Sequence, residues 1–407
     1  MRISYITMQF PVPSETFASL DIETLRQQGQ EISVFCMRPK HPLFNKLLIE
    51  RGHSGLSVLH FSMCSVFSSA VFFLRHPLMV LSLIRWFSSS CKSNPRHLAK
   101  SFLMLPSALS IFSRLYKEKP DVVHLFWGHY PSMVGFLVKK YMPKTVLSMF
   151  LGAHDLVTAY PGSARLSKIA DLLFTHSKSN LPMIAEMGMD ATKFNVVVRG
   201  TKLSGGQGLC FDKFEGLNNI KILTACRLVN GKGVDDILNI FKDVLGNFPD
   251  ATLIVAGDGP ARQDLIKLSK RLNVERGVRF LGHVPQETLL EYMRESQFFI
   301  LMSKCSGERL PNVVKEAMHQ CCIAISTNTP GIDELIDDGV NGYVVGFGSI
   351  QSAAAAVNNS INNAELALSM AKKARKKIKY DFNVEVSMSR YLQLWEQACT
   401  NLRKQQG

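Results

Sequence analysis

The residues best suited to chemistry lie in the segment 303–318, where Glu308 and Glu316 stand eight positions apart. Pro311 lies between them, and proline is favoured in the first turn of a helix. We therefore expect a helix from about Pro311, with Glu308 in the preceding loop and Glu316 a little over one turn inside. Free amides at a helix N-terminus attract phosphate, and a carboxylate accepts hydrogen bonds from two neighbouring hydroxyls. The segment thus has the groups needed to hold a sugar nucleotide at both ends.

Two cations, Arg227 and Lys232, follow an apolar run that is typical of a strand. Cations in such a loop neutralise a diphosphate, both in the bound donor and as charge accumulates on a leaving nucleotide. An isolated pair of this kind is more often surface charge, but beside the two glutamates we interpret it as a diphosphate site. Gly257 lies in a Gly-Asp-Gly turn, which forms either an ordinary strand-to-helix turn or part of the pocket wall.

Polar residues in the first half of the chain are expected to face the acceptor. Ser14 and Thr16 come soon after the opening strand. The alternative role of Ser14 is to cap the next helix. Asp155 comes after a later apolar run and has the chemistry to bind an acceptor hydroxyl, while the neighbouring His154 either lines the cleft or meets only solvent. Structural roles are expected for two other histidines, His124 and His129.

Short apolar runs alternate with helix-like segments along the whole chain, which predicts parallel sheets with crossover helices in an α/β fold. Many of the runs lack strict alternation and so fit strands covered on both faces. The expected strands are 2–9, 31–37, 122–127, 145–151, 172–176, 195–199, 222–226, 251–256, 278–281, 298–302, 323–327 and 343–345.

A chain of 407 residues that is 46% hydrophobic is long enough for two domains. The pattern lapses into a glycine-rich polar stretch between 203 and 219, which indicates a linker. We predict an N-terminal Rossmann-like acceptor domain at 1–205 and a C-terminal Rossmann-like donor domain at 206–377. Apolar residues at three- and four-residue spacing predict a final helix within 378–407 that packs back across the domain boundary.

The charge of the chain is unevenly distributed. The formal net charge is +14, and residues 1–205 hold 23 Lys and Arg against 11 Asp and Glu. Such a basic half favours an anionic partner, and the chain has no signature of a nucleic-acid-binding module, so a membrane surface is the expected partner. The alternative is that these charges only solvate surface helices.

Residues 56–115 allow two interpretations. Leu56 to Leu74 carry no formal charge, yet His60 and several serines dilute their hydrophobicity. The segment fits apolar helices that lie on a membrane surface, with basic residues toward the headgroups, or helices packed in the core of the first domain. The basic residues concerned are Arg75, Arg85, Lys92, Arg96 and Lys100.

The N-terminus has no signal-peptide pattern, and nine scattered cysteines without metal-ligand spacing indicate reduced, cytosolic usage. We therefore expect a cytoplasmic protein that is peripheral at the inner face of the cytoplasmic membrane.

Together with Thr329-Pro330-Gly331 and Asn341-Gly342, the glutamate segment resembles retaining glycosyltransferase family 4, in particular its exopolysaccharide and colanic-acid branch, which has a similar Ser-Glu-Thr-Phe after the first strand. The resemblance implies the GT-B fold, with two Rossmann-like domains facing each other across a cleft. It implies that Glu308 lies against the donor sugar, that Glu316 holds the ribose, and that Arg227 and Lys232 bind the diphosphate. It also assigns Leu310, Asn312 and Gly257 to the donor site. One departure is Arg309, where the family often has glycine.

The resemblance further implies transfer of a sugar from a UDP- or GDP-sugar to a glycan or lipid-linked acceptor in bacterial cell-surface glycan biosynthesis, with retention at the anomeric carbon. The chain has no Asp-x-Asp triplet, so we expect no metal and no cofactor, with Arg227, Lys232 and helix amides stabilising the departing diphosphate. The alternatives are a nucleotide-sugar epimerase of the same fold and a non-catalytic, membrane-associated assembly partner.

Overall fold

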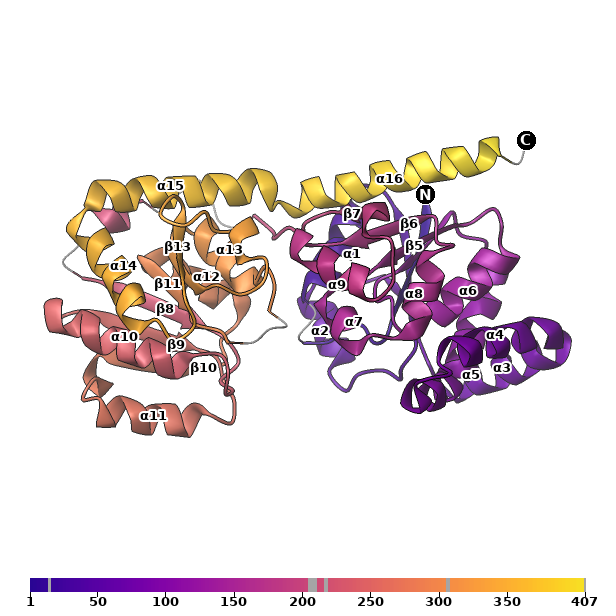
Figure 1. Cartoon of the computed structure of the whole chain (residues 1–407), viewed down its shortest axis with the longest axis horizontal. Coiled ribbons are helices and arrows are strands. Elements are labelled where there is room, and N and C mark those ends of the chain that lie inside the picture. Colours follow the sequence, from indigo (N-terminus) through magenta and orange to yellow (C-terminus); the bar gives the residue numbers. More distant parts are fainter. Residues whose placement is uncertain (14–15, 204–210, 216–218, 305–307, 406–407) are drawn as a thin grey trace. The chain divides into compact units, whose positions relative to one another are not determined.

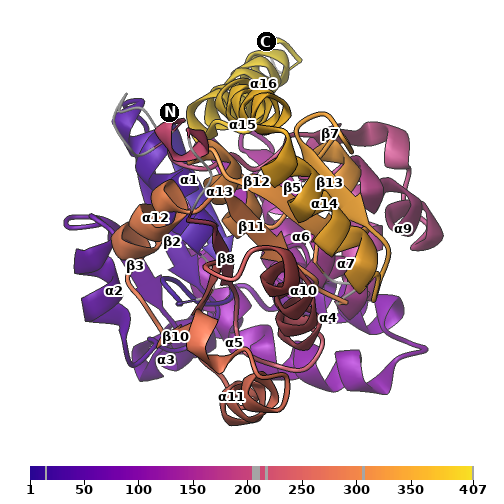
Figure 2. The same ribbon diagram turned by 90° about the vertical axis from the view of Figure 1, so that its left-hand side faces the viewer.

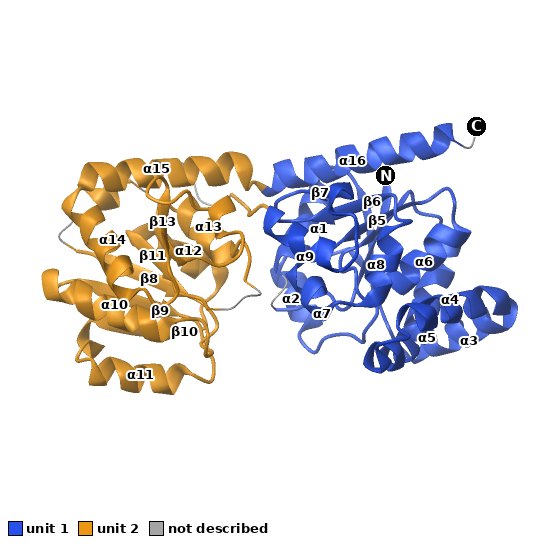
Figure 3. Cartoon of the chain, in the orientation of Figure 1, with its two compact units in different colours: residues 1–199, 384–407 blue, residues 200–383 orange. Residues whose placement is uncertain are grey.

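The computed structural model describes residues 1–13, 16–203, 211–215, 219–304 and 308–405. It contains two compact units, each built on a parallel sheet (Figures 1 and 3). Unit 1 comprises Met1–Arg199 and Val384–Gly407, and unit 2 comprises Gly200–Asn383. The predicted α/β class with two Rossmann-like parallel sheets is confirmed.

The described strands of unit 1 form a seven-stranded parallel sheet in the order β3-β2-β1-β4-β5-β6-β7. Most of these strands are buried along their length, as expected for a sheet with helices on both faces. The strands are β1 (Arg2–Thr7), β2 (Glu31–Cys36), β3 (Ser57–His60), β4 (Val122–Leu125), β5 (Val146–Phe150), β6 (Leu172–Thr175) and β7 (Phe194–Val196).

Two groups of helices cover the two faces of this sheet. One face packs against α1 and α16, and the other against α5 and α6, which in turn contact α3, α4 and α8. The helices are α1 (Thr16–Gln27), α2 (Phe44–Glu50), α3 (Met63–Arg75), α4 (Pro77–Ser90), α5 (Pro95–Glu118), α6 (Ser132–Tyr141), α7 (Ala153–Thr158), α8 (Pro161–Ser167), α9 (Leu181–Glu186) and α16 (Val384–Lys404), with the 3-10 turns η1 (Lys178–Asn180) and η2 (Ala191–Lys193).

The last helix, α16, is held on the first sheet by a buried polar contact. Trp395 is fully buried, and its indole Nε1 donates a hydrogen bond of 3.0 Å to Ser148 Oγ on β5. That hydroxyl is 2.9 Å from Nδ1 of His124, and burial lowers the pKa of His124 to about 3. His124 is therefore neutral at physiological pH and belongs to the core.

The described strands of unit 2 form a six-stranded parallel sheet in the order β10-β9-β8-β11-β12-β13. They are β8 (Lys221–Ala225), β9 (Thr252–Ala256), β10 (Val278–Gly282), β11 (Phe298–Leu301), β12 (Ile323–Thr327) and β13 (Gly342–Val345).

The helices of unit 2 also divide between the faces of its sheet. α10 packs beside α11 and α14, and α13 packs beside α12 and α15 (Figure 2). The helices are α10 (Val234–Asn247), α11 (Arg262–Arg271), α12 (Gln286–Glu295), α13 (Asn312–His319), α14 (Ile350–Asn362) and α15 (Ala364–Asp381), with η3 (Asp212–Phe214), η4 (Glu275–Gly277) and η5 (Ile332–Glu334).

The observed elements differ from the expected ones at a few places. β3 lies within 56–115, where we expected only helices. The strand was not predicted because it is short and its sequence merges with the apolar stretch that follows it. Unit 1 ends at Arg199 rather than at 205, and its returning segment begins at Val384 rather than at 378. The expected linker lies partly outside the described residues. Cys321 is disulfide-bonded, which contradicts the expectation of fully reduced cysteines, whereas its neighbour Cys322 is free.

Among the described residues, no single helix has the length and apolar character to cross a bilayer. α3 and α4 would together reach that length, but they bend by 106° where they meet.

Candidate active site

The second sheet has a switch point between β8 and β11. These neighbouring strands are followed by α10 and α13, which lie on opposite faces of the sheet. In open parallel sheets ligands bind beyond the carboxyl ends of the strands at such a point. Both of the segments that the sequence singled out for chemistry, 226–233 and 303–318, begin there.

Backbone packing joins the loops that follow these two strands. Gly233 has a φ of +70°, and a Cβ at this position would lie 2.0 Å from the carbonyl oxygen of Met302. The backbone amide of Lys304 donates a hydrogen bond of 2.7 Å to the carbonyl oxygen of Gly231. The side-chain Nζ of Lys304 lies 2.7 Å from Oδ2 of Asp236. The described parts of the two loops are therefore in direct contact, and glycine is required where they touch.

Two predicted site residues from these loops also meet. Lys232 Nζ, from the first loop, donates a hydrogen bond of 2.8 Å to Oε2 of Glu308, from the second. The side chains are 21% and 14% exposed, so the pair is partly desolvated but still open to a ligand. An ammonium and a carboxylate side by side provide a partner for a phosphate and a partner for sugar hydroxyls.

Helix α13 begins directly after this pair, as the sequence predicted. Pro311 is its N-cap residue and provides no side-chain hydrogen bond to the first amides. Leu310, just before the helix, is buried and has a φ of 47°. Asn312 is the first helical residue, and its Oδ1 accepts a hydrogen bond of 3.1 Å from Lys315 Nζ. The first turn thus presents backbone N–H groups next to Lys232 and Glu308, as an anion-binding terminus does.

Glu316 lies in the second turn of α13, and its surroundings alter its pKa strongly. Desolvation raises its pKa from the usual 4.5 to about 7, against the opposing effects of a hydrogen bond from Gln286 and the nearby charge of Lys315. A carboxyl group at this pKa changes charge near neutral pH, so its ability to accept hydrogen bonds from two hydroxyls depends on pH.

Arg227 and Gly257 occupy the neighbouring loops at the same edge of the sheet. The side chain of Arg227 is exposed and forms no hydrogen bond or ion pair within the described part of the chain. Gly257 has a φ of +126°, and a Cβ there would lie 1.9 Å from the carbonyl oxygen of Cys226, the residue before Arg227. Gly257 therefore permits the close approach of the two loops.

Unit 1 has its own group of polar residues after β4 and β5. Nδ1 of His129 lies 2.6 Å from Oδ1 of Asp155, and the other carboxylate oxygen accepts a hydrogen bond of 3.0 Å from the amide of Gly152. Asp155 is only 1% exposed, so it fixes His129 rather than standing open at the surface. His154 is exposed, and its ring lies 5.7 Å from that of His129. Thr16 is exposed at the start of α1, and Ser14 lies outside the described residues.

Three interacting groups were missed by sequence reasoning. The Lys304–Asp236 pair and the His129–Asp155 pair join residues far apart in the chain, and no local pattern indicates them. Arg199 is buried against the rings of Phe17, Phe126 and Phe150, with its guanidinium carbon 4.1 to 4.5 Å from their centroids. The sequence placed Arg199 only at the end of a strand.

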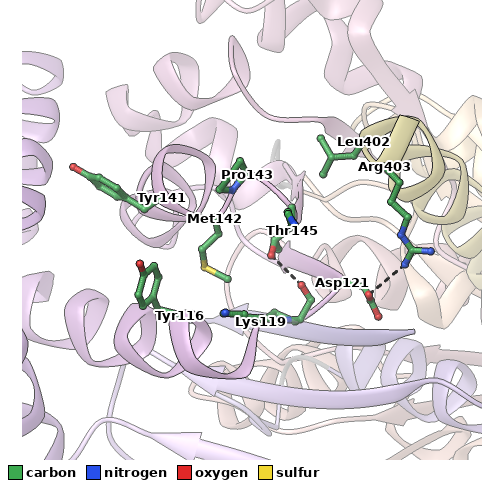
Figure 4. Close-up of a pocket in the computed structure, with 11 residues that line it drawn as sticks. Tyr116, Lys119, Asp121, Tyr141, Met142, Pro143, Thr145, Leu402 and Arg403 are labelled. Atoms are coloured by element: carbon green, nitrogen blue, oxygen red, sulfur yellow. Dashed lines mark hydrogen bonds and ion pairs between the residues drawn. The ribbon is translucent and has the colours of Figure 1, made fainter. Parts of the chain in front are cut away.

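A cavity of about 730 Å³ lies elsewhere in unit 1 (Figure 4). Asp121 and Thr145, which line it, immediately precede β4 and β5, so the cavity is at the amino ends of these strands. Ligands of parallel α/β sheets bind at the opposite edge. We therefore do not assign this cavity to the reaction.

The described residues, with the gaps given above, contain no group of three or more His, Cys, Asp or Glu arranged to hold a metal ion.

Comparison with protein families identifies the second unit. Residues 211–377 match the family of glycosyl transferases group 1. This segment is a glycosyltransferase group 1 domain. It contains the predicted donor-site residues: Arg227, Lys232, Gly257, Glu308, Leu310, Asn312 and Glu316.

The chain is also similar to glycosyltransferases named for amylovoran and lipopolysaccharide core biosynthesis. The amylovoran biosynthesis glycosyltransferase AmsK of Erwinia amylovora is 24% identical over 420 residues, which cover 97% of this chain and 99% of AmsK. The lipopolysaccharide core biosynthesis glycosyltransferase LpsE of Rhizobium meliloti is 25% identical over 276 residues, or 65% of this chain and 79% of LpsE.

Solved structures confirm the predicted GT-B fold of the chain. The crystal structure of Anabaena Alr3699/HepE in complex with UDP aligns with a TM-score of 0.71 at 17% identity, covering 98% of this chain and 100% of that one. The same protein has also been solved in complex with UDP-glucose.

Proposed function

We propose that this glycosyltransferase moves a sugar, with retention at the anomeric carbon, from a UDP- or GDP-sugar to a glycan or lipid-linked acceptor in bacterial cell-surface glycan synthesis. The observation that carries the proposal is the contact between Lys232 and Glu308 at the switch point, beside the N-terminus of α13. UDP and UDP-glucose complexes of Alr3699/HepE and the polysaccharide relatives AmsK and LpsE support it. We place the enzyme in the cytoplasm, peripheral at the inner face of the membrane.

In this proposal each residue has a distinct role. Lys232 and the exposed Arg227 neutralise the diphosphate, together with the first amides of α13, and they stabilise the charge that develops as the nucleotide leaves. Glu308 orients the donor sugar and stabilises positive charge near its ring. Glu316 accepts hydrogen bonds from the ribose hydroxyls. Leu310, Asn312 and Gly257 shape the donor site. Thr16 and His154 belong to the acceptor side, where the buried Asp155 does not bind an acceptor hydroxyl directly but holds His129 in place.

These cations and amides supply the positive charge that a divalent metal supplies in other transferases, so we propose that transfer needs no metal and no cofactor. The departing phosphate assists deprotonation of the acceptor hydroxyl. The new glycosidic bond forms on the same face from which the diphosphate departs, which retains the anomeric configuration.

The test is a transfer assay on the full chain with UDP- and GDP-sugars, a lipid and glycan extract as acceptor, and excess chelator. We expect nucleotide diphosphate release that depends on the acceptor, and an α-linked product from an α-linked donor. Glu308→Gln should lower the rate at least 100-fold, whereas the exposed Glu291→Gln should not change it. Complete loss of transfer with chelator, restored by magnesium or manganese, would refute the metal-free step.

Two controls separate the alternatives. Incubation with the donor alone converts the sugar if the enzyme is an epimerase. Unchanged cellular glycan in a Glu308→Gln strain would indicate a non-catalytic assembly partner.

A further inference from the structure

The connection between β3 and β4 is longer than its topology requires. One helix is enough to join two parallel strands, yet this connection holds α3, α4 and α5. α5 and α6 pack together against the sheet, and α3 and α4 are added beyond them. We call α3, α4 and α5 the helical insert.

The helical insert exposes large apolar side chains that the described residues of unit 1 leave uncovered. On α3, Met63, Phe67 and Leu74 are 82%, 74% and 78% exposed, and their spacing of four and seven residues places them on one face of the helix. The opposite face is already buried, with Phe72 in contact with Phe112 of α5. On α4, Leu78 and Leu81 are also exposed. α3 and α4 thus each carry large apolar side chains that the described fold leaves exposed.

The helical insert is strongly basic. Residues 63–118 contain seven Lys and Arg and one acid, Glu118, which is the last residue of α5. Exposed apolar side chains on a basic segment complement an anionic surface with an apolar interior.

A cavity of about 550 Å³ lies next to the exposed leucines, between α4, α6 and α8. Arg85 from α4, Lys140 from α6 and Arg165 from α8 line it, and no carboxylate does. Its wall is formed by the rings of Trp86 and Phe136, which stack with centroids 4.9 Å apart.

The cations of this cavity are available to an anion. Within the described residues, Arg165 donates hydrogen bonds only to neutral oxygens, namely Ser89 Oγ, Ser90 Oγ and the Trp86 carbonyl. Lys140 lies over the rings of Phe136 and Tyr141. In the described part of the chain their charges are therefore not neutralised by acids, and the guanidinium groups and the ammonium group that line one cavity can bind a phosphate group.

We propose that this cavity binds the phosphate of an anionic lipid and that the helical insert thereby docks on the membrane, with Leu78 and Leu81 in the acyl region. Leu81 lines the cavity and Leu78 lies one turn before it on α4, so the lipid phosphate and its chains meet matching groups on one helix. The inference deepens the proposed function, because it names how the enzyme reaches a membrane-bound acceptor.

The test is co-sedimentation of the full chain with phosphatidylcholine vesicles that contain or lack phosphatidylglycerol. We expect binding only to the anionic vesicles, weaker at high salt. Arg85→Gln with Lys140→Gln should reduce partitioning about 30-fold, since each cation near the surface contributes about one kcal/mol. The matched control, Lys373→Gln with Lys376→Gln on the exposed face of α15, should bind like the wild type.

A second pair of variants tests the apolar contact. Leu78→Ser with Leu81→Ser should weaken vesicle binding at least tenfold, whereas Leu366→Ser with Val386→Ser, which are also exposed, should not. UDP binding, measured on every variant, should be unchanged. Absence of UDP binding with intact vesicle binding would reject the proposed function alone.

Three results would overturn the lipid site. The first is sedimentation of the cavity and leucine variants like the wild type. The second is loss of vesicle binding and a rise in Tm with inorganic phosphate alone at low millimolar concentration, which indicates a soluble-anion site. The third is a dimer in light scattering that Leu78→Ser dissociates, with no vesicle binding, which indicates a contact between two copies.

Discussion

The charge of Glu316, in the proposed donor site, depends on pH near neutrality because burial raises its pKa. Its pKa of about 7 in the folded chain lies above the usual 4.5, so folding favours the protonated acid. Ionisation of Glu316 therefore lowers the free energy of unfolding progressively as pH rises from about 4.5. This loss reaches its full size above about pH 7.

Glu316→Gln should remove this cost, because glutamine keeps the shape of the protonated acid. We expect the variant to be more stable than the wild type at pH 8, on the order of 1 to 2 kcal/mol after allowing for partial solvent exposure. The gain should disappear near pH 4.5, whereas the exposed Glu287→Gln should show no such trend. Urea titrations at several pH values measure the difference in free energy of unfolding between the variant and the wild type. An equal difference at pH 4.5 and pH 8 would exclude the titration of Glu316 as the cause.

Single residues were predictable where a local motif defined them. Glu308 and Lys232 were found because glycine, proline and charge recur at short spacing around them, and the structure joins the two side chains. Asp236 and His129 were not found as partners, because their contacts depend on how distant loops pack.

At the scale of elements, the turn that precedes α10 depends on one glycine. Gly233 combines a φ of +70° with a backbone contact that leaves no room for a Cβ, and Lys232 lies directly before it. Displacing this turn would also displace Lys232 from Glu308.

Gly233→Ala should therefore destabilise unit 2 by about 2 kcal/mol or more and weaken UDP binding. Gly246→Ala is the matched control on the same helix, because a Cβ there has nothing within 4 Å and no unusual φ is required. We expect the control to be neutral or stabilising by up to about 1 kcal/mol. Thermal unfolding with and without UDP separates the two effects, and equal stability of both variants would contradict the role given to Gly233.

Buried strands were predictable because their apolar runs are continuous, as with β12 at Ile323–Thr327. The short strand β3 was missed because its half-buried residues, at the edge of the sheet, merge with an apolar stretch that continues into α3.

At the scale of the whole molecule, the chain returns to unit 1 through α16. The three- and four-residue spacing of its apolar side chains indicated a packed helix, and the structure buries Val384, Met388, Tyr391 and Trp395 in the core of unit 1. The exact end points of the units were not predictable, because they depend on which sheet each turn of α15 and α16 contacts.

Trp395→Ala should destabilise unit 1 by about 3 to 5 kcal/mol, since it removes a fully buried ring and the donor to Ser148. Glu396→Ala, at the exposed neighbouring position, should change stability by less than about 0.5 kcal/mol. Denaturant unfolding of both variants measures the difference. A Trp395→Ala variant as stable as the wild type would show that α16 is not part of the core of unit 1.

The central claim is that a nucleoside diphosphate binds at the switch point of unit 2, against Lys232. The most direct measurement is calorimetric titration of UDP and GDP into the wild type, Lys232→Met and the control Lys242→Met, whose lysine is exposed on α10. We expect one of the nucleotides to bind the wild type and Lys242→Met equally, and to bind Lys232→Met about 10- to 100-fold more weakly, as for loss of a charged hydrogen bond. Equal affinity of Lys232→Met and the wild type, or binding of neither nucleotide to any of the three proteins, would contradict the account.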